Sequence, residues 1–284
     1  KPDAHHQGCD GGYPGGCMSL ERLKTEKIER RLKESEAGCS LFYRETVDST
    51  NDWAKKEGQA GAKEGSIYLA ERQAAGKGRR GRIWESPAGT SLSMSLLLRP
   101  GVRREHVSML TLVMGLAAAR GIRQVSGLEA EIKWPNDVVY GGKKLCGILT
   151  ELAPRGDFVV IGTGINVNTE EFPEALRDRA TSLYLELGRK VSREETAAAV
   201  FTEFFRYYRR FLETENLELF REDYNSLLAN RGRHVRVMDL RTPFEGTALG
   251  INELGELLVR RDDTGETEAV YAGEVSVRGI YGYV

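Results

Sequence analysis

A glycine-rich stretch, Gly76-Lys77-Gly78-Arg79-Arg80-Gly81, fits the pattern G-x-G-x-x-G with a cation at every x position. In a dinucleotide-binding fold this pattern opens a helix, whose N-terminus receives the pyrophosphate. Here Pro87 and Gly89 follow closely and break any helix. The acidic residue expected about 20 positions further on is also missing, because residues 96–100 are apolar or basic. We therefore do not expect a Rossmann fold.

Other phosphate-binding patterns fail as well. The segment GTGINVN, which begins at Gly162, has no helix after it, and no Gly-Lys-Ser/Thr ends a P-loop run. A solvated surface loop or a targeting patch remains the alternative explanation of the basic cluster. However, glycines let the backbone approach a ligand, and guanidinium groups bind carboxylate or phosphate through two parallel hydrogen bonds. We interpret the loop as an anion clamp that is mobile when empty and ordered when filled.

Composition limits the class of protein. The chain has 284 residues, 40% hydrophobic and 29% charged, which is typical of a soluble enzyme with one large domain or a large and a small one. A net charge of -1 gives no global field for nucleic acid or an anionic membrane. No apolar run approaches the roughly 18 residues that a membrane span needs. The scattered cysteines contain no C-x-x-C pair, and we expect a reducing cytoplasm: Cys9, Cys17, Cys39 and Cys146.

Hydrophobic periodicity divides the chain into four parts. Residues 1–17 are glycine-rich without an apolar core, which predicts a flexible leader or a cloning remnant, not a signal peptide. Residues 18–39 hold one N-terminal helix, with an apolar stripe between Leu20 and Leu32. Residues 40–230 mix strands and helices, and residues 231–284 contain only short strands with Gly and Asp turns. We expect an α+β fold: a mixed sheet with flanking helices, followed by a small β-barrel.

Within residues 40–230 the pattern predicts specific elements. A helix begins at a cap formed by Asp48 or Ser49 and ends at Gly58. An alternating strand is expected at 66–71, and Tyr140-Gly141-Gly142-Lys143 should form a tight hairpin turn. Further strands and helices are expected at these ranges: strands 41–46, 91–99 and around 158–167; helices 106–124, 192–213 and 217–228.

Polar segments elsewhere could serve the basic loop. The segment KWPNDV places Lys133, Asn136 and Asp137 at a proline turn, and Lys144 precedes Gly147, whose missing side chain would admit a ligand. Taken singly these are ordinary features: Lys144 an edge lysine, Asp137 a turn cap, and residues 49–51 a helix cap. Together they suit a phosphoanhydride site better than hydride transfer or peptide hydrolysis. No Ser/His/Asp nucleophile set and no paired-carboxylate motif is apparent.

Five segments, read in order, resemble the signature segments of biotin protein ligases: VDSTND, ERQAAGKGRRGRIW, IKWPNDVVYGGKKLCGIL, GTGINVN and GEVSVRG. The resemblance implies a class II synthetase-like catalytic domain and an SH3-like C-terminal domain. It also implies two reaction steps. Biotin and MgATP give biotinyl-5′-AMP and pyrophosphate, and a lysine of a biotin carboxyl carrier domain on a carboxylase then takes the biotin.

The resemblance also suggests roles for single residues. Lys144, Arg79 and Asp137 would be catalytic, with Asp137 as the base near the acceptor lysine and near Mg²⁺, which would arrive with ATP. No metal site built from protein ligands alone is expected. The biotin contacts would be Ser49, Thr50, Asn51, Gln73, Gly76, Lys77, Gly78, Arg79, Lys144 and Gly147. The adenylate contacts would be Arg79, Arg80, Arg82, Trp84, Asn136, Lys144, Asn166 and Arg278.

Two departures and two alternatives accompany the resemblance. Lys77 stands where arginine is usual, which keeps the charge but removes two-point binding. Some family members also repress biotin genes through an N-terminal winged helix-turn-helix. About 40 residues precede the core here, so we expect no DNA binding. One alternative is a bifunctional ligase and biotin-operon repressor from which the DNA-binding domain has been removed. The alternative enzyme is a lipoate or octanoate ligase or transferase of the same fold. A homodimer formed through a sheet edge is compatible with the family.

Overall fold

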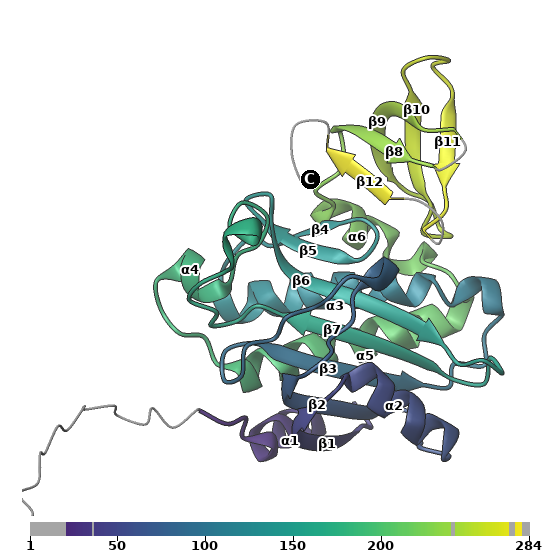
Figure 1. The fold of residues 1–284 in the computed structure, drawn as a ribbon. Coiled ribbons are helices and arrows are strands. Elements are labelled where there is room, and N and C mark those ends of the chain that lie inside the picture. The colour runs from purple at the N-terminus through teal and green to yellow at the C-terminus, as the bar shows by residue number, and fades with distance from the viewer. Residues whose placement is uncertain (1–20, 36, 240–241, 273–275, 280–284) are drawn as a thin grey trace, which may run out of the picture.

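The computed structural model describes residues 21–35, 37–239, 242–272 and 276–279. The leader predicted for residues 1–17 and the last residues of the predicted C-terminal domain lie outside these ranges. The described residues form a larger unit around a seven-stranded sheet and a smaller unit around a five-stranded sheet (Figure 1). This arrangement agrees with the α+β fold expected from the sequence. In the described part of the chain, no helix is long and apolar enough to cross a membrane.

The larger sheet has the strand order β1-β2-β3-β7-β6-β5-β4. Strands β1 and β2 are parallel, and every other neighbouring pair is antiparallel. The hairpin turn between β5 and β6 is the predicted one, and both of its glycines adopt positive φ. The strands are β1 (Ser40–Val47), β2 (Ser66–Gln73), β3 (Leu92–Leu98), β4 (Glu131–Lys133), β5 (Asp137–Tyr140), β6 (Lys143–Leu152) and β7 (Val159–Ile165).

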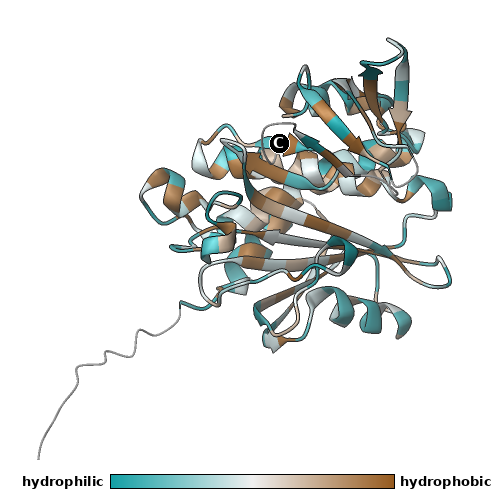
Figure 2. Ribbon diagram, turned by 45° about the horizontal axis from the view of Figure 1, so that its top comes forward, coloured by the Kyte–Doolittle hydropathy of each residue, from teal (hydrophilic) through white to brown (hydrophobic). Residues whose placement is uncertain are grey.

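Helices cover both faces of this sheet (Figures 1 and 2). Helix α3 packs with α5 over one face, and its Met and Leu residues are buried. Helix α2 covers the other face, where Trp53 packs with Tyr68 and Phe158. The α-helices are α1 (Thr25–Glu34), α2 (Thr50–Gln59), α3 (Met109–Ser126), α4 (Leu183–Leu187), α5 (Arg193–Thr214) and α6 (Arg221–Leu227), and the 3-10 turns are η1 (Arg79–Gly81), η2 (Arg104–His106), η3 (Glu174–Leu176) and η4 (Glu218–Phe220).

The expectation that residues 66–71 alternate between buried and exposed positions was wrong, because helices cover both faces of the sheet. The first six residues of β2 are all buried, because successive side chains enter opposite cores. Ile67 and Leu69 join the core under α3 and α5, whereas Tyr68 joins the core under α2. A strand covered on both faces reads as a continuous buried run.

The helix predicted to end at Gly58 continues to Gln59, so that boundary was wrong. Gly58 lies inside α2, where a Cβ atom would approach the Phe158 ring to 2.6 Å and Leu97 Cδ1 to 2.8 Å. The glycine therefore allows the helix to pack closely on the sheet and does not cap it. The helix start was correct, since Ser49 caps α2 by accepting a hydrogen bond from the Asp52 backbone N–H.

The smaller unit is an antiparallel sheet with the order β11-β10-β9-β8-β12. Within the described residues no pairing joins β11 to β12, so the sheet is small and open at its ends. Asn230 and Gly255 attach this unit to the larger one, because they accept hydrogen bonds from the Trp134 backbone N–H and indole N–H. Its strands are β8 (His234–Met238), β9 (Phe244–Ile251), β10 (Leu257–Arg261), β11 (Thr267–Val270) and β12 (Ser276–Gly279).

A buried ion pair holds the N-terminal segment to the core. Glu71, at the end of β2, lies 2.9 Å from the Arg193 guanidinium, and both side chains are only 5% exposed. Glu71 also accepts hydrogen bonds from the backbone N–H groups of Leu23 and Gly89. Four segments of the chain therefore meet at one carboxylate.

We predict that Glu71→Gln lowers the free energy of unfolding by about 3–5 kcal/mol, because Arg193 would keep a buried charge without its counter-charge. Chemical denaturation measures this change. Glu195→Gln is the matched control, since it breaks the Arg31–Glu195 pair, which has the same 2.9 Å separation but half-exposed side chains. If both variants lost equal stability, burial of the Glu71 pair would not be the cause.

Candidate functional site

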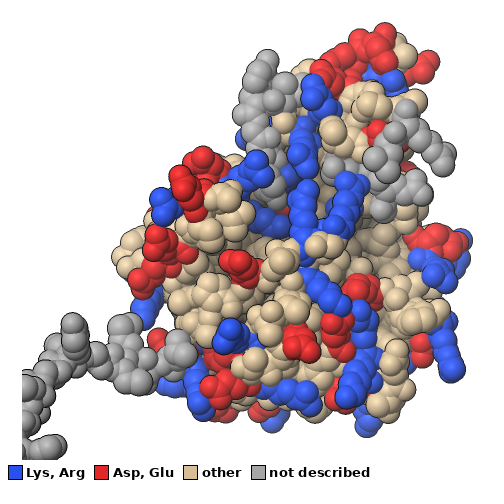
Figure 3. Space-filling view, viewed as in Figure 1, with Lys and Arg blue, Asp and Glu red and all other residues tan. Residues whose placement is uncertain are grey.

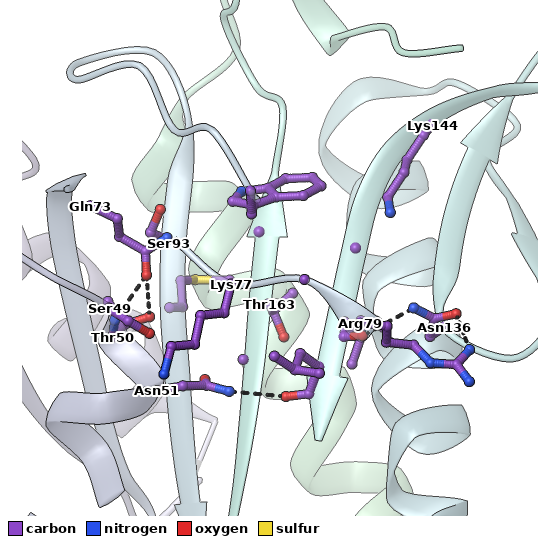
Figure 4. A pocket seen from close by; sticks show the side chains of 18 residues that line it. Ser49, Thr50, Asn51, Gln73, Lys77, Arg79, Ser93, Asn136, Lys144 and Thr163 are labelled. Atoms are coloured by element: carbon purple, nitrogen blue, oxygen red, sulfur yellow. Dashed lines mark hydrogen bonds between the residues drawn. The ribbon is translucent and has the colours of Figure 1, made fainter. Parts of the chain in front are cut away.

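A pocket opens where the basic loop crosses β3, β7 and β6. It is lined by eleven of the residues selected from the sequence: Ser49, Thr50, Asn51, Gln73, Lys77, Gly78, Arg79, Trp84, Asn136, Lys144 and Gly147. Figure 4 shows Ser49, Thr50 and Gln73 on one side of this pocket and Lys144 on the opposite side. The two sides therefore differ in chemistry, one neutral and hydrogen-bonding and the other cationic.

The neutral side is a network built on the start of α2. Gln73 Oε1 accepts hydrogen bonds from the Thr50 backbone N–H (2.8 Å) and hydroxyl (3.1 Å). Ser95 Oγ lies 2.8 Å from Thr50 Oγ1 and 2.6 Å from Asn51 Oδ1. Thr163 Oγ1 is buried without a hydrogen-bond partner among the described residues. A buried hydroxyl without a hydrogen-bond partner destabilises the fold unless a ligand or water forms a hydrogen bond with it. This side therefore suits a polar, uncharged group.

Glycines form the floor of the pocket. Gly147 of β6 pairs with Gly164 of β7, and the Trp84 indole lies directly over both. A Cβ atom on Gly164 would approach the indole ring to 2.4 Å, and one on Gly147 would approach it to 3.0 Å. Only glycine at these positions lets an aromatic ring lie flat against the sheet, next to the Lys144 ammonium, which is 5.3 Å from the ring centroid.

We predict that Gly164→Ala weakens binding of biotin, the ligand that the sequence resemblance implies, by about tenfold, because overpacking of a well-packed site costs roughly 1–3 kcal/mol and here displaces Trp84. Isothermal titration of the purified variant with biotin measures the effect. Gly115→Ala is the matched control, since a Cβ there meets its nearest atoms at an ordinary 3.7 Å inside α3. Equal affinities of Gly164→Ala and the wild-type protein would show that the indole does not need this floor.

The cationic side is formed by several elements. Lys144 Nζ lies 2.8 Å from Asp137 Oδ1. Arg79 donates to Asn136 Oδ1 at 3.0 Å and to the Ala272 carbonyl of the C-terminal unit at 3.2 Å. Figure 3 shows Lys and Arg side chains gathered where the two units meet. The loop, the KWPND turn and the C-terminal unit therefore converge on one positive region.

Burial makes these cations costly. Lys133 is 7% exposed, and its burial lowers its pKa to about 8. The charge of Asp137 opposes this shift, and repulsion from Lys144 and Arg278 adds to it. Burial and the charge of Arg80 likewise lower the pKa of Arg79. An anionic ligand would relieve both effects, since an opposite charge favours the protonated form. The region is therefore arranged for a negatively charged group.

The basic loop has a defined shape. Gly78 N–H donates to the Arg82 carbonyl at 2.7 Å, Trp84 N–H donates to the Gly76 carbonyl at 3.0 Å, and Lys77 and Ile83 form a β-bridge. At the tip Arg80 adopts φ 56° and Gly81 adopts φ 72°. These contacts fold the loop back on itself and aim Trp84 and Arg79 into the pocket.

Six selected residues do not line the pocket but lie near it in different ways. Asp137 contacts Lys144, and Asn166 donates to the Lys144 and Thr181 carbonyls, so both support the lysine. Gly76 is buried beside Gln73, where a Cβ would come within 2.9 Å of its Nε2. Arg80 and Arg82 are exposed on the loop, and exposed Arg278 of β12 acts electrostatically on Lys133.

Sequence reasoning missed other lining residues: Ser93, Met94, Ile148, Leu149, Gly162, Thr163 and Gly164. Lys133 was noted at the turn but not selected for the site. The serines had left a signal, because Ser91, Ser93 and Ser95 alternate within an otherwise apolar strand and so share one face. The G-T-G of β7 had been considered as a failed nucleotide pattern and as part of the signature segment GTGINVN, but its three residues had not been selected for the site.

No metal-like group of His, Cys, Asp or Glu lies at this pocket among the described residues. The one such group found in the described ranges is His234, Glu245 and Asp262, exposed on the C-terminal sheet. Glu245 there already accepts two hydrogen bonds from Arg236.

Comparison with known proteins identifies the chain. The profile of the Biotin/lipoate A/B protein ligase family matches residues 43–168, and that of the Biotin protein ligase C terminal domain matches residues 232–278. The bifunctional ligase/repressor BirA of Bacillus subtilis is 34% identical over 90% of this chain and 79% of its own length. The biotin–[acetyl-CoA-carboxylase] ligase of Mycobacterium tuberculosis is 32% identical over 90% of this chain and 97% of its own. The chain belongs to the biotin protein ligase family.

Structural similarity supports the same assignment. The biotin protein ligase of Aquifex aeolicus, solved in complex with biotin and ATP, has a TM-score of 0.77 and 31% identity, covering 84% of this chain and 99% of that one. The match to the C-terminal profile favours a biotin ligase over the lipoate enzyme that shares the catalytic fold. The family membership and the α+β fold expected from the sequence are thus confirmed.

Proposed function

We propose that this biotin protein ligase makes biotinyl-5′-AMP from biotin and MgATP, and then transfers biotin to a lysine of a biotin carboxyl carrier domain. The observation that carries the proposal is the two-sided pocket. A neutral hydrogen-bonding side built on Thr50 and Gln73 suits the uncharged ureido ring, and a cationic side built on Lys144 and Arg79 suits the carboxylate and the α-phosphate.

In the first step a biotin carboxylate oxygen attacks the α-phosphorus of ATP. The new bond joins carboxyl oxygen to phosphorus, the bond to the bridging oxygen breaks, and pyrophosphate leaves. Both reactants are anions and repel each other. The protein lowers the reaction barrier chiefly by holding them together against this repulsion. Lys144 and Arg79 supply that positive charge, and buried Lys133, mostly protonated at neutral pH with a pKa of about 8, adds to it.

The nucleotide would bind beside the pocket, where Arg79 contacts the Ala272 carbonyl of the C-terminal unit. Trp84 offers an aromatic face, and Asn136 offers a side chain that Arg79 already orients. Arg80, Arg82 and Arg278 are exposed nearby and suit the phosphates. Mg²⁺, brought by ATP, would neutralise phosphate oxygens, with Asp137 the nearest selected carboxylate.

In the second step the neutral amine of the acceptor lysine attacks the biotinyl carbonyl carbon, and the bond to the phosphate oxygen breaks to release AMP. The acceptor must first lose a proton. Asp137 is 6% exposed and lies at the cationic side, where its carboxylate contacts Lys144. We assign it the role of accepting that proton once Lys144 has turned to the adenylate.

Mass spectrometry of the purified protein after incubation with biotin and MgATP tests the proposal. We expect biotinyl-5′-AMP, and after addition of a biotin carrier domain we expect one biotin per carrier. Parallel reactions with lipoate and octanoate test the alternative substrate. Transfer of lipoate without transfer of biotin would contradict the proposal.

A further inference from the structure

One side chain of the basic loop is anchored outside the pocket. Lys77 Nζ lies 2.7 Å from Asp52 Oδ2 and 2.8 Å from Oδ1. Figure 4 shows the Lys77 side chain running across the front of the pocket toward Asn51 at the start of α2. Lys77 itself lines the pocket, whereas Asp52 does not. The ion pair therefore ties the loop to the helix that carries the neutral side of the site.

The position of Asp52 is fixed by its surroundings. It is the third residue of α2, and its backbone N–H is held by the Ser49 cap. Lys55 Nζ lies 3.0 Å from Asp52 Oδ1 and 3.0 Å from Glu151 Oε1, and Glu151 in turn accepts a hydrogen bond from Asn51 at 2.8 Å. The carboxylate that receives Lys77 is thus part of a polar network that reaches the pocket.

Charge explains why the loop needs this anchor. The loop carries four cations within six residues, which repel one another. Burial alone would raise the pKa of Asp52, but hydrogen bonds from Lys77 and Lys55 outweigh it, and the pKa falls below its ordinary value. Asp52 is therefore ionised at neutral pH and offsets one charge of the loop. Arg79 anchors the opposite side through Asn136 and Ala272.

We infer that Asp52 is a positioning residue: it holds Lys77 across the mouth of the pocket and thereby slows the escape of biotin and of biotinyl-5′-AMP. The inference rests on the proposed function. Asp52 acts through Lys77 and touches no ligand itself.

Dissociation rates test the inference. Enzyme loaded with labelled biotin is chased with unlabelled biotin, and release is followed for the wild-type protein, Asp52→Asn, Lys77→Met and the double variant. The pair is nearly half exposed, at 46% and 40%, so we expect release to be about two- to fivefold faster. The double variant should release no faster than the faster single variant, since both remove the same contact.

Ionic strength separates positioning from a general loss of structure. Raising the salt concentration from about 0.01 M to about 0.1 M shortens the screening length from about 30 to about 10 Å. Release from the wild-type protein should then accelerate, and release from Asp52→Asn should change less. Glu195→Gln removes the same charge from a similarly exposed pair on α5 and should release biotin at the wild-type rate.

The outcomes separate this inference from the proposed function. Release of biotin from Asp52→Asn at the wild-type rate would overturn the role of Asp52 but leave the proposed function intact. The same conclusion would follow if the increase in the double variant equalled the product of the two single increases. Failure of the wild-type protein to bind biotin would overturn the proposed function and this inference together.

Discussion

Replacing Lys144 by alanine is expected to slow adenylate formation by about 100- to 1000-fold, the range found when one preorganised charge-stabilising donor is removed. Lys144 is the cation aimed at the pocket from β6, 2.8 Å from Asp137 and beside the Trp84 ring. Without it the carboxylate and the α-phosphate would meet with less opposing charge, and Asp137 would add repulsion. Pyrophosphate release in a single turnover measures the change.

The neighbouring lysine provides the control. Lys143→Ala removes the same charge one residue away, where Nζ donates to the Arg177 carbonyl at 3.1 Å. Thermal unfolding of Lys143→Ala should resemble that of the wild-type protein, and Lys144→Ala should remain folded, because Lys133 still provides a positive charge near buried Asp137. A Lys144→Ala protein that released pyrophosphate at a near-normal rate would refute the assigned role.

Replacing Arg79 by glycine is expected to release biotinyl-5′-AMP into solution. Arg79 links the loop to Asn136 and Ala272. Burial lowers its pKa, and an anionic ligand beside it would favour its charged form. Truncating a buried, hydrogen-bonded charge costs about 2–5 kcal/mol of binding, which corresponds to at least about 30-fold faster escape. The free anhydride would then react with lysines of bystander proteins.

Labelling of an unrelated protein such as serum albumin measures this leakage. Arg155→Gly is the matched control, because it removes the same side chain from an exposed turn between β6 and β7. We expect heavy bystander labelling by Arg79→Gly and none above background by the control. If Arg79→Gly remained selective for the carrier domain, the loop would not shelter the intermediate through this residue.

The local sequence was sufficient to predict several secondary-structure elements and the cations of the site. Nearby residues determine the hairpin glycines, the Ser49 cap and the absence of a helix directly after Gly81, so predicting them needed no tertiary information. The basic loop was conspicuous because its charges are adjacent in the chain.

Features set by long-range pairing were not predictable from the sequence alone. Gly164 and Gly147 form a floor only because β6 and β7 pair in that register, and the indole above them comes from a third segment. Arg79 meets the Ala272 carbonyl across 193 positions of sequence. Gly58 was wrongly predicted to end the helix. The residue that requires a glycine at this position is Phe158, which lies 100 residues further along the chain. In the sequence, the only trace of such long-range contacts is a glycine or a serine at a position where the local pattern does not require one.

The central claim is that the loop of residues 76–82 brings two anions together and then covers their product. A crystal structure of the protein with bound biotinyl-5′-AMP tests it most directly. We expect Arg79 and Lys144 to lie within hydrogen-bonding distance of the carboxyl–phosphate linkage, with Trp84 against the nucleotide and the loop closed over the ligand. A well-occupied ligand with that loop extended into solvent and contacting neither biotin nor AMP would contradict the account.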